Sequence, residues 1–146
     1  MKRVLSVFVV FGILLMMHSC DVGFEDDGVN FYFDPFRVTS AELPESLNLN
    51  ESYEFDVTYL RNSDCAFFQG FDVVNLDDTT LNITVIGTVI TDQECNSIDE
   101  MPNATFEFTP TLNSRSYLFR FWSGESENGE QQYLEIEVPI NPTSIN

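Results

Sequence analysis

The alternation of apolar and polar side chains over residues 51–60 constrains the fold of this chain more than any other feature. The apolar side chains of Tyr53, Phe55, Val57 and Tyr59 occupy every second position, with polar side chains between them. Successive side chains of a strand point to opposite faces of a sheet, so this pattern predicts a strand with one buried face. Apolar alternation or β-forming runs recur near residues 36–44, 66–74, 81–89, 104–108, 117–121 and 134–138. From residue 31 onward no stretch has a helical period, and we expect an all-β domain.

Seven short strands joined by Asn, Asp, Ser, Gly and Pro turns predict a sandwich of two sheets. Residues 47–53 (LNLNESY) resemble the entry to the second strand of bacterial immunoglobulin-like domains. Residues 112–117 (LNSRSY) are similar to the leucine-to-tyrosine corner that precedes the sixth strand of immunoglobulin and fibronectin type III domains. These resemblances imply a seven-stranded immunoglobulin-like β-sandwich over residues 34–141, with a C-terminal tail at 142–146.

The first twenty residues have the pattern of an export signal that ends at a cysteine. Positive charge at the start precedes an apolar run over residues 4–17, which would span only about 21 Å as a helix, less than the roughly 30 Å of a bilayer core. A removable signal is therefore expected rather than a permanent membrane span. The sequence ending at Cys20 resembles the lipobox of bacterial lipoproteins. This resemblance implies a signal peptide at 1–19, acylation of Cys20 and an acidic tether at 20–33.

The chain also looks like the small uncharacterised lipoproteins of flavobacteria and other Bacteroidota. In that group an acidic stretch after the acylated cysteine resembles a signal for export to the cell surface, which implies a surface-exposed lipoprotein of the outer membrane. The alternative is a periplasm-facing anchor, because Asp21 resembles the inner-membrane retention signal of enterobacteria. Residues 78–80 (DTT) fit the O-glycosylation pattern of the same group, which implies Thr79 as the modified residue.

The charge and residue content of the exported part exclude several classes of function. After removal of residues 1–19, four arginines face all 24 acids, and the formal charge is 4 − 24 = −20. Such a charge repels nucleic acid, so we expect no nucleic-acid partner, and membrane contact only through the N-terminal lipid. The only lysine and the only histidine, Lys2 and His18, are lost with the signal. No base for a nucleophile and no phosphate-binding loop remains, so we expect neither an enzyme nor a cofactor.

Cys65 and Cys95 form an even pair once Cys20 carries the lipid. Exported proteins meet oxidising conditions, so the pair predicts a disulfide that closes a loop of about 30 residues. Two free thiols and a two-cysteine metal site are the alternatives. A zinc site would need carboxylates to complete its ligand set, because no histidine is present.

Acidic loops raise the question of calcium. Carboxylates cluster at residues 25–27, 77–78, 92–100 and 125–130. None of these clusters matches the twelve-residue calcium-binding loop. We therefore interpret them as solvated loops and predict no metal site, with Ca²⁺ binding kept as the alternative.

One candidate contact surface is visible in the strand near residues 117–121. If Tyr117, Phe119 and Phe121 face the core, Arg120 and Trp122 share the opposite face and could stack on a sugar ring or a partner's aromatic residue. The alternative is a structural role in which the arginine stem covers the tryptophan. The functional hypothesis is a non-catalytic surface module that binds a glycan or an envelope protein. The alternative is a structural accessory subunit of an outer-membrane protein complex.

Overall fold

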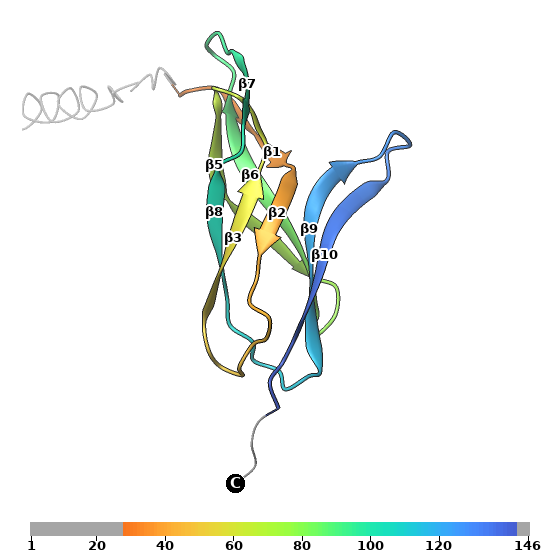
Figure 1. Cartoon of the computed structure of the whole chain (residues 1–146). Coiled ribbons are helices and arrows are strands. Elements are labelled where there is room, and N and C mark those ends of the chain that lie inside the picture. Colours follow the sequence, from red (N-terminus) through yellow and green to blue (C-terminus); the bar gives the residue numbers. More distant parts are fainter. Residues whose placement is uncertain (1–27, 143–146) are drawn as a thin grey trace, which may run out of the picture.

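A computed structural model describes residues 28–142 as ten strands with no helix among them (Figure 1). The strands are β1 (Phe31–Phe36), β2 (Val38–Glu42), β3 (Tyr53–Tyr59), β4 (Arg61–Ser63), β5 (Ala66–Asn75), β6 (Thr80–Ile90), β7 (Ser97–Glu100), β8 (Asn103–Phe108), β9 (Ser116–Glu125) and β10 (Gln131–Pro139). The predicted signal peptide, Cys20, the tether up to residue 27 and the tail from residue 143 lie outside the described residues. Within the described range no helix has the length and apolar composition needed to cross a membrane. The all-β prediction is confirmed.

The strands form two main sheets and one short pair. The smaller main sheet has the order β2-β3-β8, and the larger contains β1, β5, β6, β9 and β10 around a central β6. On one side β6 pairs with β5 along most of its length. On its other side, β1 pairs with residues 85–90 and β9 pairs in parallel with residues 80–83. Beyond that point the β9–β10 hairpin diverges from the body (Figure 1), because β1 occupies the remaining edge of β6.

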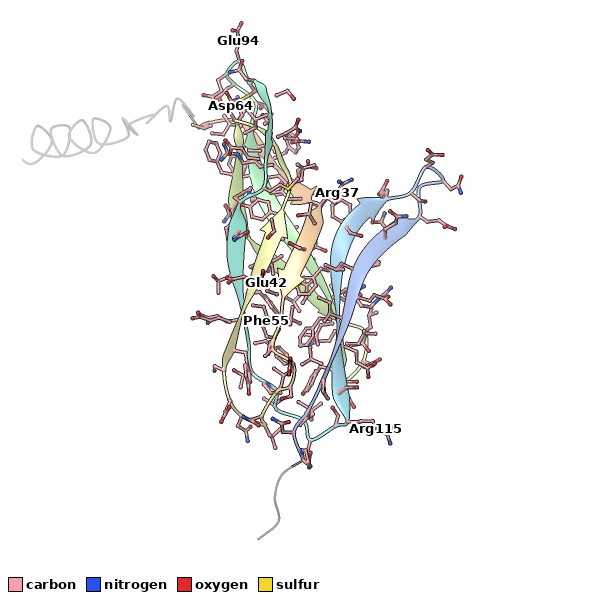
Figure 2. The ribbon with its side chains drawn as sticks, viewed as in Figure 1. Arg37, Glu42, Phe55, Asp64, Glu94 and Arg115 are labelled. Atoms are coloured by element: carbon pink, nitrogen blue, oxygen red, sulfur yellow. A yellow bond between two sulfur atoms is a disulfide. The ribbon has the colours of Figure 1, made fainter. Side chains whose placement is uncertain are left out.

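The core lies between the two main sheets. Phe55 of β3 (Figure 2) is fully buried. It packs edge-to-face on Phe119 of β9, with 5.1 Å between ring centroids. Phe71 of β5 meets Phe106 of β8 at 5.2 Å in the same way. Edge-to-face pairs add to the stabilisation from apolar burial. The alternation predicted over residues 51–60 is therefore confirmed, with Phe55, Val57 and Tyr59 all buried.

The first predicted strand is divided into two. The chain leaves the larger sheet after Phe36 and joins the smaller sheet at Val38, with Arg37 between β1 and β2. β1 also begins at Phe31, inside the segment predicted as a tether, because Phe31, Tyr32 and Phe33 pair with β6. This division, together with the short β4–β7 pair, raises the count from the seven strands predicted to ten.

The larger sheet also differs from an immunoglobulin domain in one pairing. Both sheets of that fold are antiparallel in their main strands, whereas β6 and β9 run parallel here, with Thr80 opposite Leu118 and Ile83 opposite Phe121. The contact is parallel because β6, the second strand of the antiparallel β5–β6 hairpin, lies next to β9. β5 runs in the opposite direction and would have paired with β9 in an antiparallel way. A local sequence pattern does not specify which strand of a hairpin becomes the inner one.

Candidate functional site

The predicted contact residues Arg120 and Trp122 lie on the outer face of the larger sheet, but their polar groups already have partners. The guanidinium of Arg120 donates to Glu135 at 2.7 Å and to Asn82 at 3.1 Å, and it lies 4.3 Å from the ring centroid of Tyr133. The indole N–H of Trp122 donates to a side-chain oxygen of the β10 residue Gln131. Both side chains are half-buried. A role for them in ligand contact stays a prediction.

A second surface on the same sheet face is more open. Register places Phe33 of β1 and Phe67 of β5 on either side of Thr88 in β6. The next row outward on this face has Ile86 between Pro35 and Gly70. These side chains point away from the core, because the alternate residues of β6, including Val85 and Gly87, are buried.

The two rows border an open groove of about 320 Å³, here called the aromatic groove. Its lining residues are Phe33, Gln69, Gly70, Phe71, Asp72 and Ile86. Phe33 is 60% exposed and forms an apolar wall beside the neighbouring Phe31, which is 54% exposed and in edge contact with it at 5.5 Å. Gly70 forms an open floor, since no atom lies within 4 Å of the position that a Cβ would take.

Polar groups border the groove on the β5 side. The hydroxyl of Thr88 donates to the side-chain oxygen of Gln69 at 3.0 Å, which places the Gln69 amide at the β-bulge between Phe68 and Gly70. Asp72 is exposed on β5, two residues beyond Gly70. An apolar wall with an amide and a carboxylate at its rim can hold a ligand that has one apolar face and hydrogen-bond donors.

Sequence reasoning missed the aromatic groove because its residues come from three separate strands. Gly70 follows Phe33 by 37 residues, and Ile86 follows Gly70 by 16 residues. None of the three belongs to a sequence motif that indicates a binding site. One signal was present: residues 31–33 (FYF) are aromatic within a segment otherwise rich in acids and glycine. Three consecutive aromatic side chains are not typical of a solvated tether.

The predicted disulfide is confirmed. Cys65 and Cys95 are joined, with 5.6 Å between their Cα atoms. A carboxylate oxygen of Asp64 lies within 4.8 Å of both sulfurs, but oxidised cysteines offer no thiolate to a metal, so the free-thiol and cysteine–metal alternatives are excluded.

The same end of the molecule carries Asp64 and Glu94 (Figure 2). The side chain and backbone of Asn96 donate to the Asp64 carboxylate, and these bonds lower its pKa.

The acidic turn at residues 77–80 has a structural role. Asp77 accepts hydrogen bonds from the backbone N–H groups of Thr79 and Thr80, both at 2.8 Å, and these bonds lower its pKa. The hydroxyl of Thr79 also donates to Asp77, at 3.3 Å. O-glycosylation of Thr79 stays a prediction, as does calcium binding by the acidic loops.

The segment that resembles a tyrosine corner makes the bond on which such a corner depends. The backbone N–H of Leu112 donates to the hydroxyl of Tyr117 at 3.0 Å, and Tyr117 is buried at the start of β9. In the immunoglobulin-like corner the tyrosine hydroxyl likewise bonds to the backbone a few residues upstream.

Neither a known protein family, nor a curated protein, nor a solved structure matches this chain.

Proposed function

We propose that this chain is a lipid-anchored, non-catalytic binding module of a bacterial outer membrane, anchored through Cys20 and facing outward. The observation that carries the proposal is the aromatic groove with its exposed Phe33 and Phe31. Contiguous apolar surface on a soluble domain marks interaction sites, because leaving it in water is unfavourable. The ligand class is a glycan or an envelope protein, and the Arg120–Trp122 strip on the same sheet face could extend the contact.

The groove's residues support the proposal of binding without catalysis. Gln69 and Asp72 supply its polar side-chain groups. Gln69 is bonded to the hydroxyl of Thr88, but an amide cannot act as the base that would activate a hydroxyl. Residues 28–142 contain no histidine and no lysine, which removes the usual general bases and the Schiff-base amine.

The fold belonging to this proposal is a variant of the immunoglobulin-like sandwich. Support comes from the β2-β3-β8 sheet, the β9–β10 hairpin and the Tyr117 hydroxyl bond at the corner before β9. The variant differs in placing β6 beside β9. This position exposes β5 at the edge of the sheet and brings β1, β6 and β5 together around the groove.

The location is tested by treating intact cells with a protease and comparing the native protein with Cys20→Ser. An outward-facing lipoprotein loses its domain on intact cells, and the variant is no longer attached to them. Protection until the outer membrane is broken would contradict the outward location. It would favour a periplasm-facing anchor and the accessory-subunit hypothesis.

The site is tested by placing a photo-crosslinking residue at Phe33 (Phe33→benzoylphenylalanine) in living cells. Glu107, which is exposed on β8 of the other sheet, provides the matched control position. We expect adducts from position 33 and not from 107, and their loss in the groove-filling variant Gly70→Val. A discrete band indicates a protein ligand, and a periodate-sensitive ladder indicates a glycan. Equal yields from both positions would contradict the assignment of the site.

A further inference from the structure

β5 is an edge strand with one row of backbone N–H and C=O groups unpaired among the described residues. All of its ladder bonds go to β6, from Ala66 opposite Val89 to Asn75 opposite Leu81. None of the backbone hydrogen bonds between other segments reaches its second edge. At ten residues it is also longer than the average strand of about five or six. Such an edge can pair with a strand of another chain.

The edge carries few of the charges that usually protect a sheet edge. Charged side chains prevent unwanted pairing, yet β5 has only Asp72. The opposite edge strand of the same sheet, β10, carries Glu135 and Glu137. The bulge after Phe68 interrupts one end of β5 and leaves residues 70–75 in regular register with β6. Residues 70–75 are therefore the part of the edge best suited to pairing.

Apolar side chains are exposed on both faces of this edge strand. Phe67 and Val74 point outward and are 45% and 49% exposed. Phe68 and Val73 point toward the smaller sheet yet are 41% and 38% exposed, because that sheet has three strands and covers β5 only partly. Gly70 has no side chain and leaves open space between this edge and the aromatic groove. An added strand could thus place side chains into the groove from the edge.

Charge indicates what kind of strand fits. Strands β1, β5 and β6 contain two acids, Asp34 and Asp72, and no lysine or arginine. Two more acids, Asp77 and Asp78, follow at the end of β5. A second copy of the acylated protein, whose formal charge without residues 1–19 is 4 − 24 = −20, would bring like charge to the same edge. A basic partner is favoured over self-association.

We infer that the free edge of β5 receives an extended segment of a basic protein partner. The segment pairs with residues 70–75 through backbone hydrogen bonds, and alternate apolar side chains enter the aromatic groove. Asp72, which lines the groove, and the acidic turn after β5 attract cations that flank the inserted side chains. This inference rests on the proposed function and names the class of its partner.

The test uses the full-length acylated protein in mild detergent and a labelled eight-residue peptide of alternating lysine and valine. Fluorescence anisotropy measures binding, and hydrogen exchange measures protection of the β5 amides. We expect an alternating glutamate–valine peptide to bind at least about tenfold more weakly. In two further peptides, N-methyl groups replace the backbone N–H hydrogens of alternate residues. One version blocks the N–H groups along one edge of the peptide strand, and the other version blocks those along the opposite edge. Backbone pairing predicts that one version loses binding and the other keeps it.

Protein variants locate the contact. Val74→Lys adds a cation to the edge and should weaken binding of the lysine–valine peptide. Thr105→Lys makes the same change in charge at an exposed position of β8, in the other sheet, and should weaken peptide binding far less. Gly70→Val should also weaken binding by filling the groove. Equal effects of the two lysine variants would overturn the inference, and so would equal binding of the two N-methylated peptides.

Other occupants give distinct results. A dimer of the full-length protein that Val74→Lys dissociates would show a second copy at the edge and overturn the inference. A periodate-sensitive adduct at position 33, with no peptide binding, would overturn it while leaving the proposed function standing. If neither the position-33 adduct nor peptide binding is observed, both the inference and the proposed function are overturned.

Discussion

Replacing Gly87 with alanine would place a methyl group inside the ring of Phe36. A Cβ at this position lies 1.8 Å from Cζ of Phe36 and 2.2 Å from Cε2. Carbon atoms in good contact are about 3.5 Å apart, so the tip of the ring must move by roughly 1.7 Å. Phe36 has little room to do so, because it is 4% exposed and stacked on Tyr59 with 5.5 Å between centroids.

The expected loss of stability combines two opposing effects. Overpacking a core typically costs about 1–3 kcal/mol. Alanine in a strand regains about 0.5–1 kcal/mol over glycine through the lower entropy of the unfolded chain. With both effects at the middle of their ranges, the net destabilisation of Gly87→Ala is about 1 kcal/mol. It is measured by urea unfolding followed through the fluorescence of Trp122, the only tryptophan.

Two further variants make the measurement specific. Gly70→Ala lies on the adjacent strand opposite Ile86, meets no atom within 4 Å, and should leave stability unchanged or slightly higher. Phe36→Leu removes the ring atoms that clash, so combined with Gly87→Ala it should show a favourable coupling of about 1 kcal/mol. Wild-type stability of Gly87→Ala with an unchanged denaturant slope would refute the reasoning, as would strict additivity in the double variant.

Three other predictions concern stability. Replacing Cys65 and Cys95 with serine should cost about 3–4 kcal/mol on the chain-entropy model for a separation of 30 residues, and an unchanged urea midpoint would contradict this. Tyr117→Phe should cost about 0.5–1.5 kcal/mol in the same assay, because the corner N–H loses its acceptor. The pKa of Asp64 is lowered below 3.8, so its contribution to stability is complete above that pH and is lost as the pH falls through the folded pKa. Carboxyl NMR should show that Asn96→Ala raises this pKa, and no change would exclude the Asn96 bonds as the cause.

Part of the fold could be predicted from the sequence because it depends on local patterns. The alternation at Phe55, Val57 and Tyr59 predicted a strand, which the structure has as β3. The disulfide was predicted from an even pair of cysteines in a chain expected to be exported, and the structure has it. Side-chain periodicity and cysteine number are properties of short segments and of composition, so they are readable without knowing which strands meet.

Strand pairing decided the rest. Three features depend on which strands lie side by side. These are the chain's move from the larger to the smaller sheet at Arg37, the parallel contact of β6 with β9 and the free edge of β5. Arg120 could be placed on the outer face by alternation, but its bond to Asn82 joins residues 38 positions apart. The aromatic groove likewise exists only because β1 and β5 flank β6. Alternation fixes which face of a strand is apolar, whereas a binding surface also needs the neighbours of that face, and tertiary packing selects them.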